Sequence, residues 1–264
     1  MEDNIEVTVL MSVYNTNIEQ LRESIESILN QTYKNFEFLI IDDGEKEECI
    51  NYIKQCNDSR IKLIKNNENI GLAKSLNKGL NLARGKYIVR MDSDDISYPN
   101  RIKKQLKFIK ENPKYSVVST RAEIFDENGI YGKTYKYGEI DKKDLIKGTP
   151  FIHPTMIINK NILKKIGGYP EYRRCQDYAM IMNMYAHGYK GYIINQVLLK
   201  YRMDKNGYKK KKFKYRIMEI KIRFKYFRKM KIDFLSYIYV LKPVLVGCVP
   251  KKILEKYHRI KLKK

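Results

Sequence analysis

The chain has 264 residues, 43% hydrophobic and 31% charged, with only 14 Gly and 7 Pro. These proportions exclude disordered, collagen-like and low-complexity classes and fit one large domain or one domain with an appendage. Lys and Arg number 53 against 30 Asp and Glu, a net charge of +23 that favours a polyanionic partner, either nucleic acid or anionic lipid. Residues 200–264 hold 23 basic and 4 acidic residues, whereas residues 1–199 hold 30 and 26, so a chain-wide nucleic-acid binder is a poor fit.

Cysteine usage and the N-terminus favour a cytoplasmic protein. The four cysteines show no CxxC pair and no paired spacing near His, which gives little support to a zinc ribbon or a disulfide scaffold. Residues 1–4 lack the basic and apolar regions of a signal peptide. The longest near-apolar run, 234–249, contains Lys242 and Pro243 and is shorter than the roughly 20 residues of a spanning helix. We therefore expect neither export nor a bilayer crossing.

The first half of the chain alternates β-branched runs with helical periodicity four times. The predicted strand and helix pairs are 7–13 with 18–29, 36–41 with 45–55, 61–64 with 72–82, and 87–91 with 101–110. Strands joined by crossover helices form a mostly parallel sheet, which binds ligands outside the carboxyl ends of its strands. The predicted fold class is therefore α/β, a Rossmann-like sheet with flanking helices.

The second half is predicted to be mixed. We expect strands at 116–120, 122–125, 130–135 and 156–158, a hairpin turn at 126–129, and helices at 161–166 and 177–187 with Gly188 at the C′ position. The predicted boundary gives a domain of residues 1–205 and a basic amphipathic helical tail of residues 206–264.

The tail combines charge with apolar side chains. Residues 209–231 are rich in Lys with aromatic and aliphatic residues interspersed, and the apolar run 234–249 follows. Such a segment can lie in a membrane interface, so the expected partner of residues 208–264 is an anionic membrane surface. No nucleic-acid reader motif appears, and nucleic acid is not expected as a partner. A helical cap over the first domain is the alternative that stays open.

Carboxylates follow two of the predicted strands. Asp43, in Asp42-Asp43-Gly44, is either part of a strand-ending turn or an acceptor for a nucleotide base or ribose. The run 92–95 places three carboxylates within four residues, and Mg²⁺ or Mn²⁺ would relieve their repulsion, although a solvated turn is the alternative. Asp177 is a candidate N-cap of the helix 177–187, and it could act as a general base if the chain folds back toward residues 92–95.

Several segments in this order resemble family 2 glycosyltransferases of the GT-A fold. They are 7–15 with its Ser-Val-Tyr-Asn ending, 27–33, 36–44, 69–77, 83–88, 91–95, Gly167-Gly168-Tyr169 and Gln176-Asp177-Tyr178. The resemblance spans residues 5–200. It implies a GT-A domain over residues 1–205 that binds a nucleotide-diphosphate sugar, with a UDP-sugar as the expected donor.

The resemblance also implies roles for individual residues. Ser12, Tyr14 and Asp43 match donor-binding positions, with Tyr14 packing on the base, although Tyr14 could instead be a core residue at the sheet edge. Lys74 and Asn77 match a third nucleotide-contacting segment. Asp92 matches a donor contact and, with Asp94, the Asp-x-Asp pair that holds a divalent cation, Mg²⁺ or Mn²⁺. Asp177 matches the catalytic base. His153 could reach the acceptor, or it could be a buried and satisfied His.

The implied activity is a metal-dependent, inverting transfer of a sugar to a hydroxyl of a glycan or lipid-linked acceptor in surface-polysaccharide synthesis. It would take place at the inner face of the cytoplasmic membrane, with the protein peripherally attached. The alternative is a non-catalytic basic binding protein, for nucleic acid or an anionic membrane, on a transferase-like fold.

Overall fold

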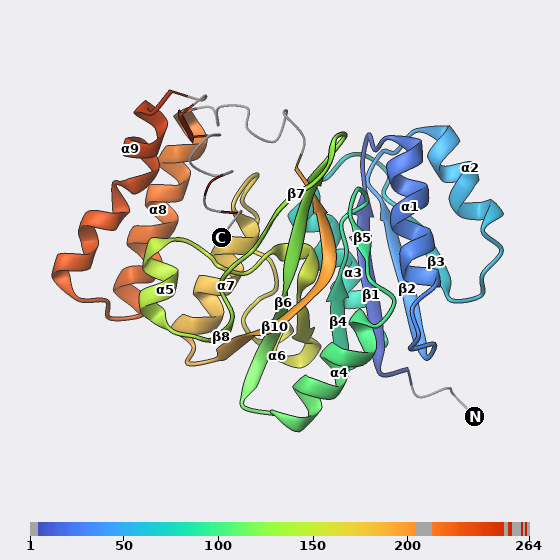
Figure 1. Cartoon of the computed structure of the whole chain (residues 1–264), viewed down its shortest axis with the longest axis horizontal. Coiled ribbons are helices and arrows are strands. Elements are labelled where there is room, and N and C mark those ends of the chain that lie inside the picture. The colour runs from blue at the N-terminus through green and yellow to red at the C-terminus, as the bar shows by residue number, and fades with distance from the viewer. Residues whose placement is uncertain (1–4, 204–212, 251–252, 255–259, 261, 263–264) are drawn as a thin grey trace.

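The β-branched runs of the sequence assemble into one mixed sheet, shown in Figure 1. The structure is a computed structural model that describes residues 5–203, 213–250, 253–254, 260 and 262. Within these residues, ten strands pair in the order β3-β2-β1-β4-β9-β6-β10-β5, with β7 beside β6 and β8 beside β10. The strands are β1 (Val7–Val13), β2 (Phe36–Asp42), β3 (Ile61–Lys65), β4 (Tyr87–Arg90), β5 (Ile96–Ser97), β6 (Tyr115–Asp126), β7 (Gly129–Lys133), β8 (Gly138–Ile140), β9 (Ile157–Asn159) and β10 (Lys190–Arg202).

Helices cover both faces of this sheet. They are α1 (Ile18–Leu29), α2 (Glu47–Gln55), α3 (Leu72–Leu82), α4 (Arg101–Glu111), α5 (Lys142–Lys147), α6 (Lys160–Lys165), α7 (Gln176–Ala186), α8 (Phe213–Lys229) and α9 (Lys242–Cys248), with 3-10 helices η1 (His153–Thr155) and η3 (Phe234–Val240). Strands β1 to β4 run parallel, β6 and β10 run parallel to each other, and β9 is antiparallel to both β4 and β6. The predicted α/β class is therefore confirmed.

The central strands are buried on both sides because their apolar side chains alternate between two cores. Leu10 and Leu39 belong to the core shared with α3, α6 and α7. Val9, Met11 and Phe38 belong to the opposite core, shared with α1, α2 and α4. Gly79 brings α3 close to the sheet, because a Cβ at this position would lie 2.3 Å from the Leu10 side chain. This packing holds the N-terminus of α3 beside the carboxyl ends of the strands.

The sequence prediction missed strands in the second half of the molecule. β10 was not predicted, and neither were β5 and β8, which pair with it. The segments predicted as two strands at 116–120 and 122–125 form the single strand β6. The predicted hairpin at 126–129 is confirmed, since β6 and β7 pair across it and Gly129 has φ of +102°.

The helices after residue 213 pack on the sheet domain through α7 and α5. On α8, Ile222, Tyr226 and Phe227 are buried in the same core as α7. The Arg223 guanidinium donates to the Ile146 carbonyl at 2.8 Å and lies 5.1 Å from the ring of Tyr178. Helix α8 therefore caps this domain, which is the alternative that the sequence left open. The predicted boundary at residue 205 and the Lys run 209–212 lie outside the described residues.

Across the described ranges, no helix combines the length and the apolar character that crossing a membrane requires.

Candidate active site

Three strands end side by side at the edge of the sheet where the predicted donor residues lie. Tyr14 follows β1 and is 60% exposed, so it is not the core residue that the sequence left as an alternative. A Cβ added to Gly44, which follows β2 and has φ of +96°, would lie 3.8 Å from the Tyr14 ring. Ser12 lies within β1, half-buried, in register with Ile41 of β2. Tyr14 thus offers an accessible aromatic face beside the β2 turn.

Asp43 organises the loop that precedes α3. Its buried carboxylate accepts hydrogen bonds from the Asn66 side chain at 2.9 Å and from the backbone N–H groups of Ile70 and Gly71 at 2.8 and 2.9 Å. The Asn69 side chain donates to the Asp43 carbonyl at 2.9 Å. Asp43 therefore fixes the loop 66–71 against the end of β2. Its contact with a nucleotide stays a prediction.

Arg90, the last residue of β4, contacts the candidate site residue Asp92, and the sequence analysis did not identify it. Its guanidinium is fully buried, forms an ion pair with Asp92 and donates to the Leu10 carbonyl at 3.3 Å. The Ser24 hydroxyl donates to the Asp92 carbonyl at 2.8 Å. Arg90 thus sets the direction of the Asp92 carboxylate and neutralises part of the acidic run. The sequence does contain a signal for Arg90, because it is a charged residue within the otherwise apolar predicted strand 87–91.

Arg202 of the missed strand β10 holds the Asp95 carboxylate and the backbone of Asp94. Arg202 donates its backbone N–H to Asp95 and its Nε to the Asp94 carbonyl, both at 2.8 Å. Burial and the neighbouring charge of Asp92 raise the pKa of Asp94 to about 6, and the same causes raise the pKa of Asp95 above its usual range. The acidic run is therefore crowded, and a bound cation would relieve its mutual repulsion.

A cavity of about 660 Å³ brings together two of the predicted residues that are distant in the sequence. Asp92, after β4, and Asp177, in the first turn of α7, both line it, so the chain folds back as the general-base hypothesis requires. His153, from η1, lines the same cavity. The remaining lining residues are Leu72, Thr149, Phe151, Ile152, Pro154, Arg173, Arg174, Cys175, Gln176, Tyr201 and Met203.

The prediction that Asp177 is the N-cap of its helix is wrong. Helix α7 begins at Gln176, with Cys175 as N-cap in the left-handed conformation at φ of 61°. The Cys175 carbonyl accepts the Ala179 N–H at 2.9 Å, so the helical hydrogen bonds start two residues earlier than predicted. Asp177 is thereby the second helical residue, on the first turn. A carboxylate at that place is stabilised by the helix dipole without being used as a cap.

His153 is buried, and its Nε2 lies 3.3 Å from the hydroxyl of Tyr169. Burial, together with the charge of Arg90, lowers the pKa of His153 well below its usual value, so the ring is neutral near pH 7. His153 is therefore a buried residue with a hydrogen-bonding partner, and it also lines the cavity.

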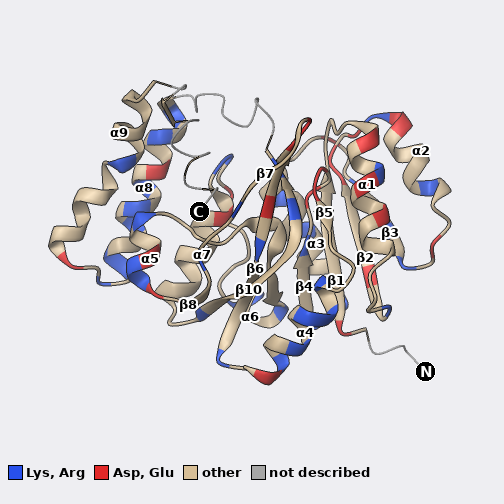
Figure 2. Ribbon diagram, in the orientation of Figure 1, with Lys and Arg blue, Asp and Glu red and all other residues tan. Residues whose placement is uncertain are grey.

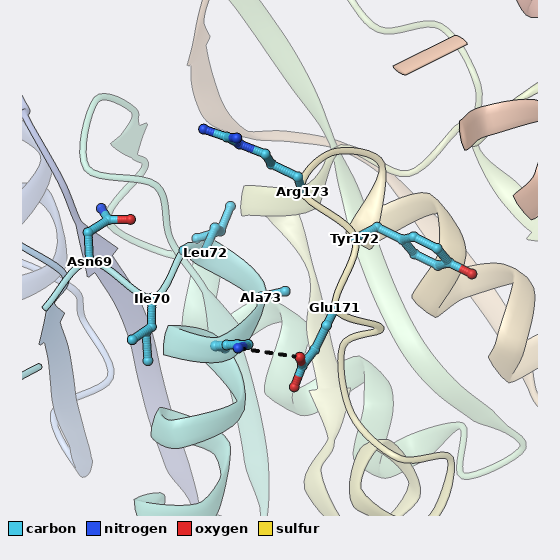
Figure 3. A pocket seen from close by; sticks show the side chains of 9 residues that line it. Asn69, Ile70, Leu72, Ala73, Glu171, Tyr172 and Arg173 are labelled. Atoms are coloured by element: carbon cyan, nitrogen blue, oxygen red, sulfur yellow. Dashed lines mark ion pairs between the residues drawn. The ribbon is translucent and has the colours of Figure 1, made fainter. Parts of the chain in front are cut away.

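A second cavity, of about 360 Å³, adjoins the first, because Leu72 and Arg173 line both. Figure 3 shows it between the N-terminus of α3 and the segment that carries Glu171 and Tyr172. Lys74 lies on its wall and pairs with Glu171 at 3.7 Å. The predicted contact of Lys74 with a nucleotide stays a prediction.

Asn77 has a structural role that the sequence analysis did not anticipate. Its side-chain amide donates to the Tyr169 carbonyl and accepts the Tyr169 N–H, both at 2.8 Å. Asn77 therefore ties α3 to the segment before α7. Its predicted contact with a nucleotide stays a prediction.

The site can now be compared with known proteins. The family model described as glycosyl transferase family 2 matches residues 8–167, from the second residue of β1 through β4 and the acidic run to just past the end of α6. The chain belongs to glycosyl transferase family 2. It is accordingly a glycosyltransferase, and the alternative of a non-catalytic binding protein is not supported.

Relatives of this glycosyltransferase match nearly the whole chain. EpsE of Bacillus subtilis strain 168, named as a glycosyltransferase, is 35% identical over 98% of this chain and 95% of its own length. A UDP-Gal:alpha-D-GlcNAc-diphosphoundecaprenol beta-1,3-galactosyltransferase of Escherichia coli is 31% identical over 94% of both chains.

The solved structures support the fold. S. aureus TarS, residues 1–349 in complex with UDP, superposes with a TM-score of 0.68 at 18% identity, covering 92% of this chain and 70% of that chain. The expected GT-A fold with C-terminal helices is thereby confirmed.

Proposed function

We propose that this glycosyltransferase moves a sugar from a nucleotide-diphosphate sugar, with UDP as the nucleotide, to a hydroxyl of a lipid-linked or glycan acceptor in surface-polysaccharide synthesis. The observation that carries the proposal is the shared cavity of Asp92 and Asp177. One end supplies a carboxylate beside the predicted donor residues, and the other supplies a carboxylate on a helix start. Sugar transfer needs a donor-binding group and a general base in the same cavity, because the donor and the acceptor must meet there.

In this proposal, Asp92 and Asp94 hold a divalent cation, Mg²⁺ or Mn²⁺. Carboxylate oxygens suit these hard cations. The pKa of Asp94 is raised first by burial and then by the charge of Asp92, and a cation would offset the second of these. No group of three or more His, Cys, Asp and Glu side chains poised for a metal occurs in the described part of the chain. In this proposal, donor phosphates complete the coordination by the two carboxylates. When bound, the cation supplies electrostatic stabilisation of the departing diphosphate.

The residues of the chain account for the remaining steps. Tyr14 would stack on the base, with Ser12, Asp43 and the segment of Lys74 and Asn77 around the nucleotide. Asp177 would accept the proton of the acceptor hydroxyl as the oxygen attacks the anomeric carbon from the face opposite the diphosphate. A single displacement inverts the anomeric configuration and leaves no covalent intermediate on the protein.

The acceptor class and the location follow from the relatives and from the charge of the tail. The E. coli relative is named for a diphosphoundecaprenol-linked acceptor, and we extend a lipid-linked or glycan acceptor to this chain. The basic residues of 208–264 would then hold the enzyme peripherally on the anionic inner face of the cytoplasmic membrane, with no role for nucleic acid.

The test separates binding from chemistry. Asp177→Asn should lower nucleoside diphosphate release with acceptor by about 10² to 10⁴-fold while donor affinity, measured by calorimetry, stays the same. Asp94→Ala should remove the part of donor binding that depends on Mg²⁺ or Mn²⁺. Glu48→Gln, which changes a carboxylate in the first turn of α2, is the matched control and should alter neither quantity. If donor affinity falls as much as the rate in Asp177→Asn, Asp177 is not the base. Full donor binding in excess chelator would rule out the metal role.

A further inference from the structure

The outer face of the C-terminal helices carries a row of exposed apolar side chains that the activity does not use. Five large residues within twelve positions of η3 and α9 are between 56% and 87% exposed: Phe234, Leu235, Ile238, Leu241 and Leu245. We call this set the apolar stripe. Its members recur mainly every three or four residues, so they lie along one side of the segment.

The opposite side of the same segment is packed on the protein. Val240 and Pro243 are buried, and the ring of Tyr237 contacts that of Phe227 on α8 at 5.9 Å between centroids. The Arg216 guanidinium of α8 donates to the Pro243 carbonyl at 2.6 Å. The side of η3 and α9 opposite the stripe therefore packs on α8, and the stripe faces away from α8. Two other exposed apolar residues, Phe213 and Phe224, lie on α8, whereas Leu82 lies on α3 and Ile130 on β7. An exposed apolar row of this kind marks an interaction surface.

The basic side of α8 lies beside the segment that carries the stripe. Ring contact between Phe224 and Tyr237, at 5.9 Å, joins the exposed side of α8 to η3. Lys221, Lys225 and Arg228 are exposed on that side. Figure 2 shows basic residues along α8, whereas the ribbon of η3 and α9 is almost free of charge. Residues 213–249 hold nine Lys and Arg against two Asp and Glu.

The combination of an apolar stripe with neighbouring basic residues favours one kind of binding partner. A second copy of the chain would bring the same positive charge to the interface and be repelled. Nucleic acid would satisfy the cations but leave the stripe in water. An anionic bilayer offers phosphate groups to the cations and, just below them, an apolar boundary for the stripe.

We propose that the apolar stripe, flanked by Lys221, Lys225 and Arg228, docks this enzyme on an anionic bilayer surface. The inference rests on the membrane attachment in the proposed function, and it assigns that attachment to η3 and α9. The apolar face of α8, by contrast, is already used in packing on α7.

The test uses the full chain with vesicles of phosphatidylcholine, with or without phosphatidylglycerol. The variant Phe234→Ser/Leu235→Ser/Ile238→Ser should weaken binding to the anionic vesicles on the order of 100-fold, because three large apolar side chains no longer enter the interface. The matched control changes three residues about half exposed in β7 and in the segment between β7 and β8, Ile130→Ser/Tyr135→Ser/Tyr137→Ser, and should bind like the unmodified chain. The variant Lys221→Gln/Lys225→Gln/Arg228→Gln should lose the preference for anionic over neutral vesicles.

Several outcomes would overturn the inference. One is equal vesicle binding by the stripe variant and the unmodified chain. Another is a dimer in sedimentation that becomes a monomer in the stripe variant without any vesicle binding. Nucleoside diphosphate release with a water-soluble acceptor distinguishes the two proposals, because the stripe variant should keep it. If release occurs and vesicles are not bound, the docking inference alone fails. If vesicle binding depends on the stripe but no donor is turned over, the proposed function alone fails.

Discussion

The ion pair of Arg90 with Asp92 should stabilise the fold as well as direct the carboxylate. The Arg90 side chain is fully buried, whereas that of Asp92 is 29% exposed. Removing one partner of a buried pair costs about 3 to 5 kcal/mol, and hydration of Asp92 reduces this to about 2 to 3 kcal/mol. Loss of the hydrogen bond from Arg90 to the Leu10 carbonyl adds little to this cost, because the carbonyl still accepts the N–H of Met91 at 3.2 Å. Arg90→Met and Asp92→Ala should each lower the free energy of unfolding by that amount.

A double-mutant cycle measures the pair directly. Urea unfolding of Arg90→Met, Asp92→Ala and the double variant should give a coupling free energy of about 1.5 to 3 kcal/mol. The exposed pair of Lys107 and Glu111, 3.8 Å apart on α4, is the matched control and should give less than about 0.5 kcal/mol. A coupling for Arg90 and Asp92 as small as that of the control would refute the role assigned to Arg90.

Two further predictions concern burial. Because burial lowers the pKa of His153 from its usual 6.5 while the unfolded chain takes up a proton near that pH, acidification below pH 6.5 favours unfolding. The slope attributable to His153 is up to about 1.4 kcal/mol per pH unit, and urea titrations of His153→Gln should show a shallower loss than the unmodified chain. Phe227→Ala, at a fully buried position of α8, should cost about 3 to 5 kcal/mol, whereas Phe224→Ala, at an exposed position of the same helix, should cost less than about 1 kcal/mol. Equally mild effects of the two would contradict the docking of α8 on α7.

The first half of the fold was predictable because each strand and helix pair is a local unit. The periodicity of 7–13 and 72–82 reproduces β1 and α3 residue for residue. The second half depends on distant pairing. β10 lies between β6 and β5, which precede it by many residues, so its pairing cannot be read from the residues next to it in the sequence. Its 13 residues and its Arg202 were therefore missed.

The site shows the same division. Strand order alone indicates that Asp43 and Asp92 lie at one edge, since parallel strands share their carboxyl ends. The meeting of Asp92 with Asp177 requires the chain to return through η1 and β9, where the Arg90 N–H donates to the Met156 carbonyl at 2.9 Å. Residue spacing carries no information about that return. Similarly, the apolar residues of α8 were visible in the sequence, but which of them face α7 depends on the packed structure.

Helix α7 connects the candidate chemistry to the C-terminal helices. Asp177 lies on its first turn, its outer side is covered by α8, and Arg174, just before it, lies 5.4 Å from the ring of Tyr215 on α8. The support of the apolar stripe is therefore packed against the element that carries the candidate base. If the stripe rests on a bilayer, the cavity of Asp92 and Asp177 takes a fixed orientation to that surface, because packed side chains connect the two. Deleting residues 208–264 would consequently expose the buried side of α7 as well as remove the stripe, so substitutions on the stripe separate membrane docking from folding where a truncation cannot.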